Sequence, residues 1–592
     1  MDAHKQDSPG LEVHYGPANP LDRSDPPIPG LAPGTQLIEA GSVHAEGARP
    51  VPVDIEVLED VAIQVRDGVT LYGDVYRPAG AGPLPAILIY TPYGKRGGYW
   101  NANLSAPRFG VPADAVSGLQ SFEALDPAYW CEHDYALVVV DARGTTHSEG
   151  DMVFQGTAAG RDVYDTVEWI AAQEWSTGKV AMAGNSQLAM VQWAAAALRP
   201  PHLTAIAPWE GLTDVYRDVV VRGGIPDTAF HDGDIIAFLH GTGRFEDLAE
   251  MIRHHPLDNA YWADKRADLS VVEIPAYVVA SWTNPIHTRS TLRAFQQLPT
   301  DNKWLRLHNT QEWVDIATGG NIEDLRRFYD RYLKDEDNGW ESTPRVRYSV
   351  LDPGGKDDTD RTADTWPPVA VPSTTLHLDA ASGRLTKEQP ATESSVSYAS
   401  TDPTASATFR CTIEEETELL GPLNVRLWIE TSEGDDLDLF AAVYKTDATG
   451  KPLHHFVFPA LKDFVQSLEQ DGRLPSALAY SGPLGRIRAS HRALDPEKST
   501  TLEPYLSHER EDLVEPGAPV QLDLGLWPTG MLLHPGETLV LEIAGHFTGP
   551  VTPPRTGQAG PDTGELPTRN TGTHTIRTGG RFDSRAFLPI VP

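Results

Sequence analysis

The stretch GKVAMAGNSQLAMVQWAAAA, residues 178–197, decides the fold class of this chain. A run of small and apolar residues predicts a short buried strand, and the Ala-rich segment after Gly184-Asn185-Ser186 predicts a helix. Serine is favoured as a helix cap, but a strained turn between a strand and a helix can also expose a nucleophilic serine hydroxyl above a parallel sheet. The usual G-x-S-x-G pattern is broken at Leu188. From these residues alone, Ser186 is either a cap or a nucleophile.

Similar apolar runs lie on both sides of this stretch, and helical patterns separate them. Strands that alternate with helices predict a parallel sheet with helices on both faces. A hairpin is predicted at Arg66-Asp67-Gly68 and a helix over residues 158–173. The runs are AILIY (86–90), ALVVVD (136–141), LTAIAPW (203–209) and PAYVVASW (275–282).

Changes in pattern along the chain divide it into three parts. Residues 1–50 are rich in Pro and Gly and predict an irregular arm. An α/β domain is expected over 51–345, with a helical cap inserted at about 212–270. From 346 to 592, short alternating runs between turn residues predict a β-sandwich or jelly roll.

The composition excludes several classes of partner. A formal net charge of -35 argues against binding to nucleic acid and weakens attraction to anionic membranes. The only two cysteines, Cys131 and Cys411, form no disulfide framework, and the first residues lack an apolar signal region. We therefore expect a cytoplasmic protein that binds a small-molecule substrate. The arm and the β domain could form the interface of a homodimer.

No cofactor or metal is expected. The cap contains His231, Asp232, Asp234 and His240, but their spacing matches no metal motif. We interpret them as polar cap surface or pocket lining.

Several blocks of sequence, in this order, carry a resemblance to a known family. They are RDGVTLYGDVYRP (66–78), TPYGK (91–95), VVVDARGTTHSEGD (138–151), GNSQLAMVQW (184–193), AIAPWEGLTDVYRD (205–218) and FYDRYLKDEDNGW (328–340). The chain resembles the cocaine-esterase and glutaryl-acylase (CocE/NonD) family of α/β hydrolases, relatives of the X-prolyl dipeptidyl peptidases. The resemblance implies an α/β-hydrolase domain with a helical cap, followed by a C-terminal β jelly-roll domain.

The resemblance also assigns roles to three residues. Members of the family use a serine at the position of Ser186, which favours the nucleophile. A tyrosine in the block that matches TPYGK helps to form the oxyanion hole, so Tyr93 would donate its phenolic hydrogen. The backbone N–H of Gln187 would be the second donor.

The other two members of the catalytic triad do not carry over. The family's acid lies in a Gly-Trp-Tyr-Asp string, which here reads Ser-Trp-Thr-Asn and ends at Asn284. An ungapped alignment of residues 303–313 places Glu312 where the family has its histidine. A glutamate with an ordinary pKa near 4.3 is a poor base toward serine.

Three alternatives for the base therefore stay open. His287 could act as the base with Glu312 orienting it, because a triad is defined by geometry and not by chain order. His308, at the end of the preceding strand, could take the same role, and Glu210 is a second candidate acid. In the third alternative no histidine acts as the base.

Three functional hypotheses follow. The first is a serine hydrolase or acyltransferase that acts on an ester, lactone or amide carbonyl of a mostly apolar small molecule. The second is a non-hydrolytic reaction such as dehydration, cyclisation or proton transfer, with Glu312 as the acid or base. The third is a protein that binds carbohydrate through the jelly roll. The residues expected to bind substrate are Trp209, Asn284, Phe230 and Tyr216.

Overall fold

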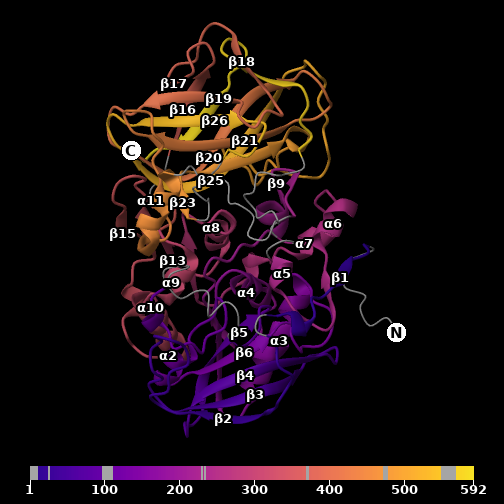
Figure 1. The fold of residues 1–592 in the computed structure, drawn as a ribbon, viewed down its shortest axis with the longest axis vertical. Helices are drawn as coiled ribbons and strands as arrows, with labels where there is room; N and C mark the ends of the chain where they lie inside the picture. Colours follow the sequence, from indigo (N-terminus) through magenta and orange to yellow (C-terminus); the bar gives the residue numbers. More distant parts are fainter. Residues whose placement is uncertain are drawn as a thin grey trace.

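The computed structural model describes residues 11–24, 27–96, 111–228, 231, 235–368, 372–470, 478–548 and 568–591. An α/β unit forms one end of the molecule and a β unit forms the other (Figure 1). The Pro-rich start of the chain is not wholly irregular, because β1 (Tyr15–Pro17) pairs with β11 (Arg244–Glu246) and β2 (Gly34–Ile38) pairs with β3 (Ile55–Gln64).

One mixed sheet organises the α/β unit. Its strand order is β15-β14-β13-β12-β8-β7-β5-β6-β4-β3-β2, and the strands from β14 to β6 run parallel. The remaining strands are β4 (Thr70–Pro78), β5 (Leu84–Thr91), β6 (Ala136–Asp141), β7 (Ser176–Met182), β8 (Leu203–Ile206), β12 (Ala276–Ser281), β13 (Lys303–His308), β14 (Val346–Val350) and β15 (Asp358–Ala363).

Helices cover both faces of this sheet, as the alternation of patterns predicts. Two apolar clusters fill the space between helices and strands, one including residues of α3 and α8 and the other including residues of α2 and α10. The helices are α2 (Pro127–Glu132), α3 (Thr157–Ala171), α4 (Gln187–Ala197), α8 (Thr288–Gln297), α9 (Glu312–Ala317) and α10 (Gly319–Leu333).

The main sheet continues past residue 345, where the β domain was expected to begin. Strand β14 pairs in parallel with β13, and Val346 and Val350 are fully buried. The alternating pattern there belongs to the edge of the α/β sheet, because β15 pairs antiparallel with β14 and is the last strand on that side.

Short elements make up the segment expected to form the cap. Their apolar side chains form a cluster of their own, which includes Met190 of α4. They are the π-helical turn η3 (Tyr216–Val220), β9 (Val221–Arg222), β10 (Ile225–Pro226), α5 (Ile236–Phe238), β11, α6 (Leu248–His254), α7 (Ala260–Asp264) and the 3-10 turn η5 (Leu269–Val271).

The C-terminal unit is a largely antiparallel sheet that closes on itself, since β28 pairs with both β16 and β20. A separate apolar cluster fills it. Its elements are β16 (Ser373–Asp379), β17 (Arg384–Thr386), β18 (Ser394–Ala399), β19 (Ser406–Thr412), β20 (Thr417–Thr431), β21 (Asp438–Thr446), β22 (His455–Phe456), α11 (Lys462–Gln470), β23 (Ala479–Tyr480), β24 (Leu484–Arg488), β25 (Val520–Leu533), β26 (Thr538–Ala544), β27 (Thr573–Thr578) and β28 (Arg585–Pro589). Within the described ranges, no helix is long and apolar enough to cross a membrane.

Candidate active site

Ser186 lies on a strained turn between β7 and α4. Its backbone has φ 54° and ψ -120°, in the left-handed half of the Ramachandran plot that side chains other than Gly rarely adopt. Its hydroxyl makes no capping hydrogen bond to the helix. The strand, the sharp turn and the helix therefore match the nucleophile elbow, and the helix-cap interpretation is not supported.

The phenol of Tyr93 lies beside this serine. Burial raises the pKa of Tyr93 well above its usual value, and the nearby charges of Glu123 and Glu312 raise it further. Hydrogen bonding with the side chains of Gln187 and Ser186 lowers the pKa of Tyr93 by a smaller amount. The phenol stays protonated and can donate. Gln187 is the first residue of α4, so its backbone N–H has no acceptor within the helix.

Two buried glutamates, Glu123 and Glu210, and the half-buried Glu312 interact electrostatically near Tyr93. Burial raises the pKa of Glu312 well above its usual value, and the charges of Glu123 and Glu210 add to this effect. Burial also raises the pKa of Glu123 to about 8 and raises that of Glu210. These carboxyl groups cannot all be ionised together at neutral pH. A raised pKa makes a glutamate a better base than the sequence alone suggests.

Asn284 connects the loop after β12 to Glu312. Its Nδ2 donates to Oε2 of Glu312 at 3.3 Å, while its Oδ1 accepts from the backbone N–H groups of Ile286 and His287, both at 3.0 Å. Asn284 was expected to bind substrate, and the structure places it between the start of α8 and the carboxyl group of Glu312.

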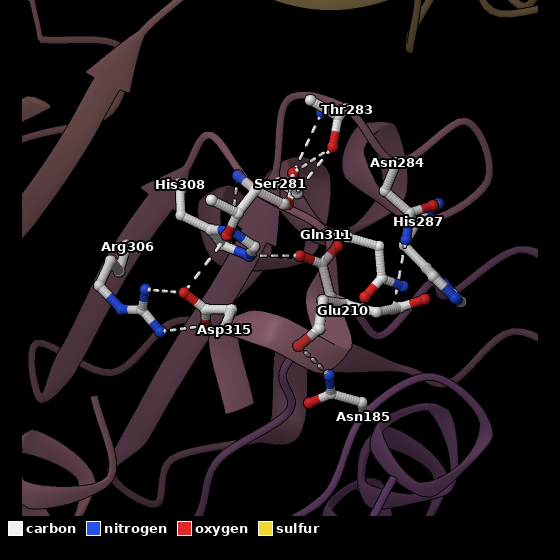
Figure 2. Close-up of polar contacts among 12 residues, drawn as sticks. Asn185, Glu210, Ser281, Thr283, Asn284, His287, Arg306, His308, Gln311 and Asp315 are labelled. Atoms are coloured by element: carbon white, nitrogen blue, oxygen red, sulfur yellow. Dashed lines mark hydrogen bonds and ion pairs between the residues drawn. The ribbon is translucent and has the colours of Figure 1, made fainter. Parts of the chain in front are cut away.

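The ring of His287 is not hydrogen-bonded to Glu312. The residue is 1 % exposed, and neither ring nitrogen has a hydrogen-bond partner. Burial lowers the pKa of His287 to about 3, so the imidazole is neutral. Figure 2 shows its backbone N–H bonded to Asn284 and no such bond from its ring.

The ring of His308 lies between two acidic side chains (Figure 2). Its Nε2 is 2.8 Å from Oε1 of Glu210, and its Nδ1 is 3.6 Å from Oδ1 of Asp315. Asp315 in turn accepts from Arg306. The candidate acid Glu210 thus contacts a histidine, and this pair is part of a network of polar contacts with Asp315 and Arg306.

The other residues expected to bind substrate are buried or fall outside the described part of the chain. Trp209 is 2 % exposed and packs edge-on against Tyr277. Tyr216 is fully buried and donates its hydroxyl to the carbonyl of Pro256. Neither ring is exposed to solvent in this structure, and their binding of a substrate stays a prediction. Phe230 lies outside the described residues.

Sequence analysis missed Glu123. It lies on the loop before α2, has a φ of 61°, and its carbonyl accepts the backbone N–H of Asn185 at 3.1 Å. No motif surrounds it in the sequence, and only the fold brings it to a serine 63 positions away. Over the described part of the chain, no group of three metal-ligating side chains comes together.

Two family models match this chain. The model for the X-Pro dipeptidyl-peptidase (S15 family) matches residues 67–244. The model for the C-terminal non-catalytic domain of X-Pro dipeptidyl-peptidases matches residues 338–586.

Individual proteins match over longer stretches. A CocE/NonD family hydrolase from Staphylococcus aureus has a crystal structure with a TM-score of 0.84 and 31 % sequence identity, covering 98 % of this chain and 99 % of that one. A provisionally named serine esterase of Mycobacterium bovis is 25 % identical over 585 residues, covering 82 % of this chain and 89 % of its own. The cocaine esterase of a Rhodococcus strain is 27 % identical over 372 residues, covering 52 % of this chain and 60 % of its own.

Proposed function

The chain belongs to the CocE/NonD family of hydrolases, and from this premise we propose that it is a serine esterase with Ser186 as its nucleophile. The observation that carries the proposal is the strained turn at Ser186 with the protonated phenol of Tyr93 beside it. Amides, lactones and acyl transfer involve the same attack on a carbonyl. Family membership favours this chemistry over a non-hydrolytic proton transfer.

In the proposed mechanism, Oγ of Ser186 attacks the ester carbonyl while the carboxylate of Glu312 takes the serine proton. The hydroxyl of Tyr93 and the backbone N–H of Gln187 donate to the oxyanion that forms. When the tetrahedral intermediate collapses, Glu312 returns the proton to the leaving alcohol. Water then attacks the acyl-serine while Glu312 accepts its proton, and Glu312 returns that proton to Oγ of Ser186 as the acid is released.

The raised pKa of Glu312 supports its role as the base. Proton transfer from serine is more favourable to a carboxylate of higher pKa, and burial, with a further contribution from the charges of Glu123 and Glu210, supplies that shift. Asn284 holds one oxygen of Glu312 in place. Where the family has histidine and aspartate, this chain has Glu312 and Asn284. The side-chain amide of Asn284 donates to the carboxylate of Glu312.

A second candidate base is His287. Its imidazole is neutral and neither nitrogen is paired, which is rare for a buried polar group and is often linked to function. A side-chain rotation would be needed to join it to Glu312. This arrangement is the rearranged triad expected from the sequence.

The first experiment is labelling with a fluorophosphonate probe, followed by intact-protein mass spectrometry. We expect one adduct on the wild type, none on Ser186→Ala, and labelling about 100-fold slower on Glu312→Gln. The exposed Glu336 supplies the control Glu336→Gln, which should label at the wild-type rate. Absence of an adduct on folded wild-type protein would refute the proposal.

The pH dependence of labelling separates the two bases. A base acts when deprotonated, so with Glu312 the rate should still rise with pH well above 4.5. With His287, whose pKa is about 3, the rate should be flat above about pH 4. A flat profile, together with slow labelling of His287→Ala, would assign the role to the histidine.

The closed antiparallel sheet after β15 supports the jelly roll expected for the C-terminal domain. The cytoplasmic location and the homodimer stay predictions.

A further inference from the structure

Asn185, the residue before the proposed nucleophile, connects three parts of the site. Its backbone N–H donates to the carbonyl of Glu123 at 3.1 Å. Its backbone also forms a bridge with Trp209, just after β8, whose carbonyl accepts the N–H of Ser186 at 3.3 Å. The side chain reaches a third segment, because Nδ2 donates to the backbone carbonyl of Glu312 at 3.2 Å (Figure 2). The turn of the serine is therefore joined directly to the start of α9.

The side-chain contact can be removed without the other two. Asn185 is 1 % exposed, so water does not compete for its amide. Its Oδ1 has no hydrogen-bond partner among the described residues, which leaves Nδ2 as the atom that ties the side chain down. The contacts with Glu123 and Trp209 use only the backbone of Asn185. A substitution at this position therefore breaks the link to Glu312 and keeps the rest of the turn.

Two amides hold Glu312, one at each end of the residue. The amide of Asn284 donates to Oε2 of its carboxylate, and the amide of Asn185 donates to its backbone carbonyl. The first contact acts on the group that takes the proton, whereas the second acts on the place from which the side chain starts. Glu312 opens α9, a helix of six residues. So short a helix is not stable by itself, and its position depends on such contacts.

We propose that Asn185 is a positioning residue that sets the separation between Oγ of Ser186 and the carboxylate of Glu312. Asn185 and Ser186 share a peptide bond, so a hydrogen bond from Asn185 to Glu312 limits how far the base can move from the nucleophile. Proton transfer needs the two oxygens within about 2.6–3.2 Å, or one water between them. A displacement of about 1 Å can slow a reaction about 100-fold. This role rests on the proposed function of Ser186 and Glu312.

The test is the rate at which the fluorophosphonate probe labels full-length Asn185→Ala. We expect labelling to be about tenfold slower than in the wild type, because one hydrogen bond that positions the base is lost. At the end of the reaction every molecule should still carry one adduct. The final extent separates slow chemistry from loss of folded protein, since unfolded molecules are not labelled. A wild-type rate in folded Asn185→Ala would overturn the proposal.

Asn424→Ala is the matched control. Asn424 lies on β20 of the C-terminal unit and is also 1 % exposed. Its Nδ2 donates to the carbonyl of Thr501 and to Oδ1 of Asp523, both at 2.9 Å, and its own Oδ1 lacks a partner within the described ranges. The substitution removes a similar buried amide away from the serine, so labelling should keep the wild-type rate. Equal slowing in both variants would assign the effect to a general loss of stability and reject the positioning role.

Asn185→Ser keeps the position testable if Asn185→Ala does not fold. The serine hydroxyl lies one bond closer to the backbone than Nδ2 does, so it does not reach the carbonyl of Glu312. We expect the same slowing, by about tenfold, with full labelling at the end. Labelling of Asn185→Ser at the wild-type rate would contradict the proposal in the same way.

A double-mutant cycle shows whether Asn185 acts through Glu312. Once the carboxylate is absent, its position no longer matters, so Asn185→Ala combined with Glu312→Gln should label within about twofold of Glu312→Gln alone. A further tenfold loss in the double variant would mean that Asn185 acts independently of the base, against the proposal.

Failure of the proposed function gives a different result. If Glu312 is not the base, Glu312→Gln labels at the wild-type rate, and the positioning role of Asn185 is rejected together with it. If Glu312→Gln is slow and Asn185→Ala is not, the base stands and only the positioning role is rejected.

Discussion

At the scale of single residues, buried carboxyl groups dominate the surroundings of Ser186. Burial raises the pKa of Glu123, Glu210 and Glu312, because each charge is poorly solvated, and the charges of Glu123 and Glu210 raise that of Glu312 further. An aspartate at position 284 would add a fourth negative charge. Asn284 instead donates to Glu312, which explains why acid and base of the family's triad change together.

The substitution Glu123→Gln tests this electrostatic account. The folded pKa of Glu123 is about 8 and its unfolded value is near 4.5, so the wild type loses stability as pH rises between these values. Glutamine does not titrate. We expect the variant to gain at least about 1.4 kcal/mol relative to the wild type between pH 5 and pH 8. Urea unfolding at both pH values measures this, and a pH-independent difference would contradict it.

At the scale of elements, the turn between β7 and α4 depends on close packing. Gly184 has a φ of 119°, and a Cβ atom there would lie 2.6 Å from Cβ of Leu188. Leu188 is fully buried in the first turn of α4. Leu188, which breaks the G-x-S-x-G pattern, thus packs directly against the turn that presents the proposed nucleophile, Ser186.

Gly184→Ala should therefore destabilise the protein and slow labelling of Ser186. The matched control is Gly80→Ala, where φ is 73° and nothing lies within 4 Å of the added Cβ. Both variants carry backbone strain of about 1 kcal/mol, but only Gly184→Ala adds about 1–3 kcal/mol of overpacking. Chemical unfolding and labelling rates measure both effects. Equal losses in the two variants would mean that packing at the turn is unimportant.

At the scale of the whole molecule, the C-terminal unit supports the loop that contains Asn284. Nε1 of Trp527 donates to the carbonyl of Asn284 at 2.9 Å, and the guanidinium of Arg289 lies 4.5 Å from the centre of the Trp527 ring. Gly530 of the same strand, β25, lies against the ring of Trp282. The β unit therefore fixes the residues that orient Glu312.

Trp527→Phe should reduce activity through this contact between units. It removes the hydrogen bond to Asn284 and keeps a ring beside Arg289, at a cost of about 1 kcal/mol. We expect kcat for a p-nitrophenyl ester to fall several-fold. In Trp428→Phe, a control within the same unit whose ring packs against Phe582, kcat should not change. Unchanged kcat in Trp527→Phe would show that the loop is held without the β unit.

Local patterns determined the secondary structure and the framework of the site. The strand expected at 136–141 is β6, and the hairpin at Arg66-Asp67-Gly68 joins β3 and β4. These predictions succeed because apolar periodicity and turn residues act over a few positions. The boundary near residue 345 depends on which sheet β14 joins, and its own residues do not determine that.

The sequence by itself predicted the α/β framework, because apolar periodicity acts over neighbouring residues. Its own residues left Ser186 as either a helix cap or a nucleophile, and the resemblance to the family favoured the nucleophile and indicated the loss of the family's histidine and aspartate. Only the tertiary structure decided which groups surround the serine. Glu123 comes from a loop with no motif, Glu210 pairs with His308, and the ring of His287 stays unpaired. The physical reason is that pKa values depend on burial and on charges that meet only when distant strands end at the same edge of the sheet.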